Sequence, residues 1–147
     1  MTTYHERTGL LVVDVQNDFA DPSGSLSVDD GDVIVPRANQ EIAEARAAGG
    51  LVVYTQDWHP PVTKHFFKDG GIWPEHCVQD TWGAEFHPDL VLDGEIVRKG
   101  ADGRDGYSGF SVLPSFKVQM RVISASPFRS SPTMVSLPMV YCAPGSM

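Results

Sequence analysis

The stretch Gly9-Leu10-Leu11-Val12-Val13-Asp14-Val15 is almost continuously apolar and is interrupted only by the acidic residue near its end. A short apolar run without alternation is typical of a strand that is buried on both faces of a parallel sheet. Residues 36–48 begin with proline, carry apolar side chains on one face and are followed by two glycines, which predicts an amphipathic helix. A second apolar run, residues 51–56, predicts a second strand.

These three predicted elements form a strand-helix-strand unit, whose crossover is almost always right-handed. A third strand is expected at residues 95–99, after a long loop. The sequence therefore predicts an α/β fold with a doubly wound parallel sheet and helices on both faces. In such sheets functional groups gather at the carboxyl ends of the strands, and Asp14, Asp57 and Lys99 each lie at such an end.

One carboxylate and three imidazoles are concentrated in a short segment that begins at the end of the second predicted strand. They are Asp57, His59, His65 and His76. Imidazole nitrogens combined with a carboxylate suit zinc, iron or manganese, and an Asp-x-His step in extended chain places both donors on the same side. Each histidine taken alone is more simply interpreted as a loop residue. The four spaced donors together predict one mononuclear metal site.

The chain has 147 residues and a formal net charge of −8, with an isoelectric point near 4.9. This acidity argues against nucleic acid and anionic membranes as partners and favours a neutral or cationic small molecule. No stretch approaches the roughly 18 consecutive apolar residues of a membrane span. The two cysteines, Cys77 and Cys142, are too few for a disulfide framework. We therefore expect a cytoplasmic protein with reduced thiols.

Residues 113–147 differ abruptly in composition from the rest of the chain. They contain no Asp or Glu, five of the eleven prolines and four of the five methionines. The prolines forbid a long helix, and only residues 117–123 are compatible with a strand. We therefore divide the chain into residues 1–112 and an atypical Pro/Ser/Met-rich tail that is expected to be irregular. A natural extension and a segment produced by a reading-frame slip or an altered transcript are both compatible with this composition.

Five blocks of sequence occur in a fixed order between residues 8 and 112. They are Asp14-Val15-Gln16-Asn17-Asp18-Phe19, Thr55-Gln56-Asp57-Trp58-His59-Pro60, Trp73-Pro74-Glu75-His76-Cys77-Val78-Gln79, Gly83-Ala84-Glu85-Phe86-His87-Pro88, and Arg98-Lys99-Gly100 with Tyr107-Ser108-Gly109-Phe110. Together these blocks resemble the nicotinamidase branch of the isochorismatase-like cysteine hydrolases. The resemblance implies a three-layer, Rossmann-like α/β/α fold that is incomplete at the C-terminus. It also implies hydrolysis of nicotinamide to nicotinate and ammonia in NAD salvage, through a thioester intermediate.

The resemblance also assigns roles to individual residues. Asp14 would be the acid/base partner of a cysteine nucleophile, and Lys99 would support the thiolate and position Asp14. One divalent ion, Zn, Fe or Mn, would hold the pyridine nitrogen of nicotinamide or a pyrazinamide-like amide. The metal ligands would be Asp57, His59, His65 and His76, and the residues lining the ring pocket would be Phe19, Trp73 and Tyr107. Without the resemblance, Asp14 would be interpreted as a capping residue, Lys99 as a solvated lysine and the aromatic residues as core.

The nucleophile motif of these hydrolases, Gly-x-x-Thr-Asp-x-Cys-Val, is missing from this chain. Cys77 has no identified base of its own. Cys142 lies at a compatible separation from Lys99, but Pro144 and only three further residues follow it, too few to build a helix. Two hypotheses stay open: a metal-dependent nicotinamidase that uses Cys142, and a catalytically inactive family member that keeps the metal-binding pocket. Without further strand-helix units we expect the strand bearing Asp14 at a sheet edge, which favours a homo-oligomer.

Overall fold

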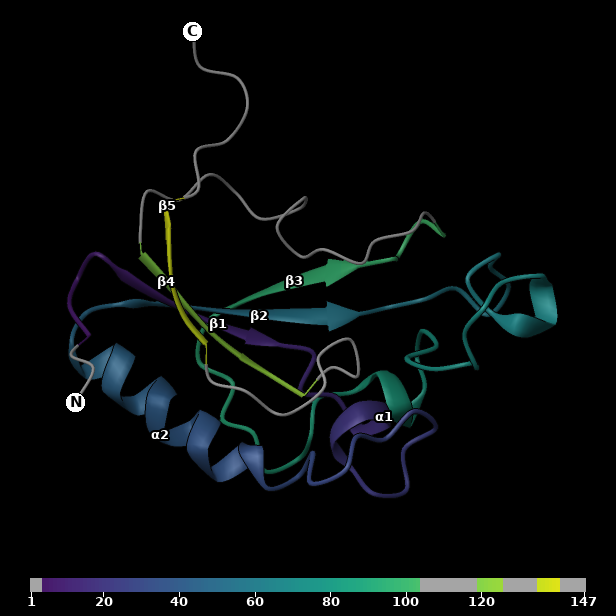
Figure 1. Cartoon of the computed structure of the whole chain (residues 1–147), viewed down its shortest axis with the longest axis horizontal. Coiled ribbons are helices and arrows are strands. Elements are labelled where there is room, and N and C mark those ends of the chain that lie inside the picture. The colour runs from purple at the N-terminus through teal and green to yellow at the C-terminus, as the bar shows by residue number, and fades with distance from the viewer. Residues whose placement is uncertain (1–3, 104–118, 126–134, 141–147) are drawn as a thin grey trace, which may run out of the picture.

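The computed structural model describes residues 4–103, 119–125 and 135–140, with 119, 120 and 135–140 described by their backbone alone. A five-stranded sheet in the order β3-β2-β1-β4-β5 organises these residues (Figure 1). Its strands are β1 (Thr8–Val13), β2 (Leu51–Asp57), β3 (Glu95–Lys99), β4 (Gln119–Ser124) and β5 (Val135–Val140). The first four are parallel, and β5 pairs with β4 in the antiparallel sense. The predicted α/β fold with a parallel sheet is therefore confirmed.

β1 lies in the interior of the sheet, between β2 and β4. Val13 of β1 lies opposite Thr55 of β2 and opposite Ser124 of β4. The prediction that the strand bearing Asp14 lies at a sheet edge is therefore wrong. The reason is that residues 119–124 form a parallel strand, β4, that pairs with β1 on the side opposite to β2.

Two parts of the compositionally atypical tail are strands. β4 covers most of the predicted strand at 117–123, whereas β5 contains Pro138 and was not expected from the sequence. β5 is the last strand of the sheet, where a residue without an N–H donor is tolerated. These strands depart from the irregular structure expected of the tail. The division of the chain after residue 112 stays a prediction.

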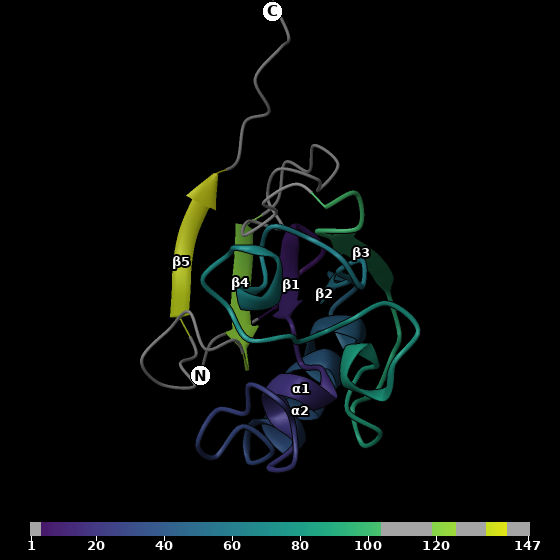
Figure 2. The same cartoon turned by 90° about the vertical axis from the view of Figure 1, so that its right-hand side faces the viewer.

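The helix α2 (Ile34–Ala47) lies on one face of the sheet, as Figure 2 shows. It begins two residues before the predicted start, so that Pro36 occupies its first turn, where a missing N–H costs nothing. Gly49 ends the helix in the left-handed region, with φ 73°, and its N–H donates to the carbonyl of Arg46 at 3.0 Å. Three one-turn helices lie in the connections that leave β1 and β2: α1 (Asn17–Ala20), η1 (Phe67–Asp69) and η2 (Trp82–Ala84). None of the described helices is long and apolar enough to cross a membrane.

Apolar side chains of the sheet form one cluster on each face, because successive strand residues point to opposite sides. The larger cluster joins the sheet to α2 and includes Leu10, Val12, Ile42, Tyr54 and Ile123. The smaller cluster contains Leu11, Val53, Val97 and Val122, and no residue of a described helix belongs to it. Both clusters include residues of β4, so this strand is part of the packed sheet.

Replacement of Ile123 by alanine tests whether β4 packs beside β1. Ile123 is 1% exposed and belongs to the larger cluster, so Ile123→Ala is expected to lower the free energy of unfolding by about 2–5 kcal/mol. Urea denaturation measures this loss. The control is Val62→Ala, at a side chain that is 74% exposed, which is expected to change stability by less than about 0.5 kcal/mol. An Ile123→Ala protein as stable as the control would contradict this packing.

Candidate functional site

The three charged residues predicted at strand ends meet at the carboxyl edge of the sheet. The Nζ of Lys99, at the end of β3, lies 2.9 Å from Oδ2 of Asp14 and donates a hydrogen bond to Oδ1 of Asp57. All three side chains are buried. Parallel pairing places Lys99 directly opposite Asp57, and Asp14 follows the end of the neighbouring strand β1. A lysine buried with two carboxylates is a cluster with one net negative charge.

Asp14 leaves β1 in the left-handed region of the backbone, with φ 53°. A non-glycine residue rarely adopts this conformation, which is typical of strained positions at functional sites. The turn is held by the N–H of Asp14, which donates to the carbonyl of Thr55 at 3.2 Å. The Thr55 hydroxyl in turn donates to Oδ1 of Asp14 at 2.7 Å. The carboxylate therefore bonds to Thr55 and Lys99, and it does not cap α1, which begins at Asn17.

Burial dominates the electrostatics of this cluster. It raises the pKa of Asp14 to about 6, an effect that Lys99 opposes and that the charge of Asp57 reinforces. Burial lowers the pKa of Lys99, but the two carboxylates outweigh it, and the net pKa is raised. Lys99 therefore stays cationic, while Asp14 can take up and release a proton near neutral pH.

Three of the predicted metal ligands lie together beside this cluster. One ring nitrogen from each of His59, His65 and His76 lies within 4.8 Å of the others, and all three side chains are buried. The Nδ1 of His76 lies 2.7 Å from the carbonyl of Pro74, so it carries the proton and leaves the lone pair on Nε2. This buried Nε2 has no hydrogen-bond partner among the residues that the structure describes. Burial also lowers the pKa of His76, which keeps the ring neutral, as a metal ligand must be.

Asp57 connects the imidazoles to the charged cluster. Its Oδ1 accepts from Lys99 and lies 3.8 Å from Nε2 of His59. The carboxylate therefore borders the histidine group without belonging to the three closest donors. Buried imidazoles beside one carboxylate are a donor set suited to a divalent transition metal.

Backbone pairing holds His59 in place. Its N–H donates to the carbonyl of Cys77 at 2.9 Å, and its carbonyl accepts from Gln79 at 2.8 Å. Gly100, with φ 74°, packs against the ring: a Cβ atom there would lie 2.6 Å from Cε1 of His59. Gly100 belongs to one of the blocks quoted above, but its role in making room for the ring was not expected from the sequence.

The aromatic residues predicted to line a ring pocket are placed differently from one another. Phe19 is fully buried, with its ring centre 5.5 Å from that of His76. Trp73 is half-buried and stacks beside His65 at 6.4 Å. Tyr107 lies outside the described residues. Phe66, which the sequence did not single out, lies 5.6 Å from both His59 and His76 and walls the histidine group.

Cys77 is buried in a structural position. Its N–H donates to Oδ2 of Asp18 at 2.7 Å, and its thiol lies 3.8 Å from the carbonyl of Gly83. Burial raises the pKa of the Cys77 thiol far above its usual range, and nearby carboxylates add to this shift. A thiol that stays protonated is a poor nucleophile. Cys142, the other candidate, lies outside the described residues.

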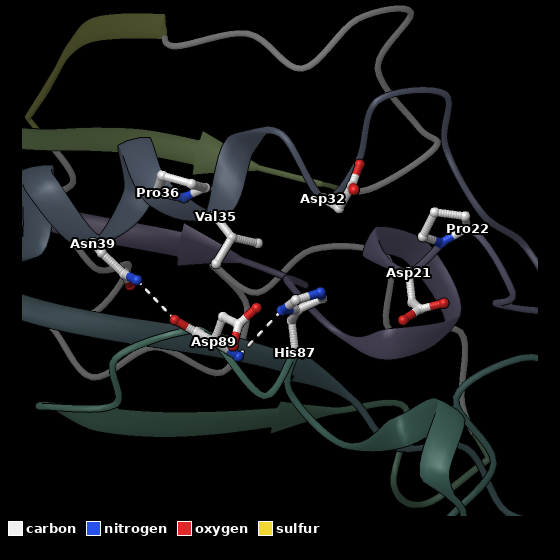
Figure 3. A pocket seen from close by; sticks show the side chains of 8 residues that line it. All are labelled: Asp21, Pro22, Asp32, Val35, Pro36, Asn39, His87 and Asp89. Atoms are coloured by element: carbon white, nitrogen blue, oxygen red, sulfur yellow. Dashed lines mark hydrogen bonds between the residues drawn. The ribbon is translucent and has the colours of Figure 1, made fainter.

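A separate acidic hollow of about 460 Å³ lies beside the start of α2 (Figure 3). Asp21, Asp32 and Asp89 line it together with His87, whose Nδ1 accepts from the backbone N–H of Asp89 at 3.3 Å. None of the predicted site residues lines this hollow. His87 thus lines this hollow and bonds within its own turn.

Residues 8–114 match the isochorismatase domain, and the chain therefore belongs to the isochorismatase family. The nicotinamidase of Escherichia coli is 38% identical over 119 residues, covering 69% of this chain and 55% of the relative. The nicotinamidase/pyrazinamidase of Mycobacterium tuberculosis is 41% identical over 106 residues, with the same coverage of each chain. This chain thus spans about half the length of the curated relatives it matches.

Solved structures agree with the sequence relatives. The pyrazinamidase of Pyrococcus horikoshii in complex with zinc is 46% identical, with a TM-score of 0.66 over 71% of this chain and 58% of the other. PnC1 from L. infantum in complex with nicotinate is 30% identical, with a TM-score of 0.70 over 84% of this chain and 69% of the other. Asp14, Asp57 and Lys99 all lie within the residues 8–114 that match the isochorismatase domain.

Replacement of Lys99 by methionine tests the buried charge cluster. Lys99→Met leaves two carboxylates buried without their cation, so the free energy of unfolding should fall by about 3–5 kcal/mol at about pH 8. A carboxyl whose pKa is raised in the folded protein contributes stability at low pH that is lost as pH rises through that pKa. Loss of the cation raises the pKa of Asp14 further, so part of the stability should return at about pH 5.

Urea denaturation of Lys99→Met at both pH values measures this effect. Lys68→Met is the control, because Lys68 pairs with Glu75 at the exposed surface and its removal should cost under about 1 kcal/mol. Equal losses for the two variants at both pH values would contradict a buried cluster.

The reactivity of Cys77 provides a second test of the site. Because the thiol is fully buried and its pKa is raised, iodoacetamide is expected to leave Cys77 unmodified in the folded protein and to alkylate it after denaturation. Mass spectrometry of the Cys77 peptide, at matched reagent concentrations, measures the modified fraction. Rapid alkylation in the folded state would restore Cys77 as a candidate nucleophile.

Proposed function

We propose that this chain carries the site of a metal-dependent amide hydrolase of the nicotinamidase type, which converts nicotinamide and water to nicotinate and ammonia in NAD salvage. The observation that carries the proposal is the contact of the Asp14–Lys99 pair with Asp57, which in turn borders three buried imidazoles. At the carboxyl edge of the sheet, this arrangement combines a proton-exchanging carboxyl, a fixed cation and a set of nitrogens that could bind a metal. The sequence relatives of the chain include nicotinamidases, and one structural relative was solved with nicotinate.

The proposed chemistry assigns one task to each charged residue. The thiol sulfur bonds to the amide carbon while Asp14, with its raised pKa, takes the thiol proton. Asp14 then gives this proton to the amide nitrogen, which leaves as ammonia when the C–N bond breaks and the thioester forms. Lys99 holds the Asp14 carboxylate in position and stabilises negative charge on the thiol. Addition of water to the thioester then releases nicotinate and returns the thiol.

His59, His65 and His76 would hold a divalent ion, with Asp57 beside them. The bare, buried Nε2 of His76 supports this assignment, since a polar atom without a partner is costly to bury. Zinc is the favoured ion, because the P. horikoshii relative was solved with zinc. When bound, the ion supplies a fixed electrophile that orients the pyridine nitrogen of the substrate. Phe19 and Trp73, beside His76 and His65, would contact the ring.

The identity of the nucleophile separates this function from its alternative. The environment of Cys77 argues against it, which leaves Cys142 as the cysteine that the hydrolase hypothesis requires. Cys142 lacks the surrounding motif of the family. A chain that binds the metal and the pyridine ring without turnover is therefore the second candidate function.

Ammonia release tests the proposal. The purified chain, incubated with nicotinamide and zinc, should release ammonia, and Asp14→Asn should lower the rate by about 10²–10⁴-fold because the proton-exchanging group is lost. Asp21→Asn serves as the matched control, since Asp21 lines the separate acidic hollow and should leave the rate unchanged. Cys142→Ala should abolish the reaction. Zinc binding without any ammonia release would favour the inactive alternative.

A further inference from the structure

Gln16 makes three hydrogen bonds with the backbone at the carboxyl end of the sheet. Its Oε1 accepts from the N–H of Asp57 at 2.8 Å, and its Nε2 donates to the carbonyl of Asp57 at 2.8 Å. The same Nε2 donates to the carbonyl of Ala84 at 2.8 Å. The side chain is 0% exposed. A single carboxamide thus satisfies both backbone groups of one buried residue.

The position of Gln16 explains why a side chain makes these bonds. β1 ends at Val13, and the turn at Asp14 takes the backbone out of the sheet, whereas β2 continues to Asp57. The last residue of β2 therefore has β3 on one side and no β1 backbone on the other. Gln16 replaces the missing strand residue. Only one orientation of its amide fits, because Oε1 faces an N–H and Nε2 faces two carbonyls.

The residue held in this way is the one on which the charged cluster and the imidazoles converge. Oδ1 of Asp57 accepts from Lys99 and lies 3.8 Å from Nε2 of His59. We propose that Gln16 is a positioning residue: by fixing the backbone of Asp57, it keeps the Asp57 carboxylate where it contacts Lys99 and reaches the metal. This inference rests on the proposed metal-binding function of the histidine group.

The chain offers a matched control in Gln56. Its Nε2 also donates to the carbonyl of Ala84, at 2.9 Å, and its Oε1 accepts from Arg98 at 3.1 Å. Gln56 is buried like Gln16, but it makes no hydrogen bond to the backbone of Asp57. Methionine is similar in size to glutamine, so replacing either glutamine by methionine removes a buried carboxamide and leaves the side-chain volume nearly unchanged. Only the change at residue 16 releases Asp57.

Cobalt(II) titration of the full chain tests the inference, because the visible absorption of this ion reports both affinity and ligand geometry. Gln16→Met is expected to bind Co²⁺ about 10–100-fold more weakly than the unmodified chain, with a changed absorption spectrum, since partners that orient metal ligands carry effects of this size. Gln56→Met should keep the affinity within about threefold and the spectrum unchanged, apart from any loss of thermal stability. Circular dichroism checks that each variant is folded.

The outcomes are distinct. A folded Gln16→Met protein with unchanged Co²⁺ affinity and spectrum would overturn the positioning role and leave the metal site intact. An unmodified chain that binds no Co²⁺ would overturn the proposed function and the inference together. If Gln16→Met does not fold, Gln16→Asn replaces it, because its shorter amide cannot reach Asp57 and Ala84 at once. The same criteria for affinity and spectrum then decide.

Discussion

The buried ion pair of Lys99 with two carboxylates is the constraint on which the rest of the structure depends. A charge removed from water is tolerated only when it is paired and hydrogen-bonded, so Asp14, Asp57 and Lys99 must all arrive at one point. They come from three different strands, and only adjacent parallel pairing with the observed register brings them together. The sheet thus positions these charged side chains and also forms the hydrophobic core. The segment that carries His59, His65 and His76 directly follows the end of β2.

Much of this arrangement was predictable because it depends on local patterns. The apolar runs of β1 and β2 have the length and the uniform composition of buried parallel strands, and Asp14, Asp57 and Lys99 mark the ends of their strands. The topology rule for parallel sheets then places these ends at one edge. The spacing of His59, His65 and His76 indicated a shared site, and the structure brings the three rings together.

The remaining features depend on contacts between distant residues, which periodicity does not encode. The atypical composition of the tail gave no sign that β4 would pair with β1 and place that strand in the interior. Gln16 was visible as part of a block, but its bonds to Asp57 and Ala84 span 41 and 68 residues. The burial of Cys77, which sets the state of its thiol, is likewise a tertiary property.

The end of β3 affects two parts of the site, through Lys99 and through the Gly100 that follows it. The residue before it delivers the ammonium group to the carboxylates, and Gly100 itself leaves the space in which the His59 ring lies. The Lys99 ammonium and the space for the His59 ring therefore depend on two residues that are joined by one peptide bond. Insertion or deletion of a single residue near this bond would shift both at once. The charged cluster and the position of the His59 ring thus share one register, so a shift of β3 along the sheet changes both of them together.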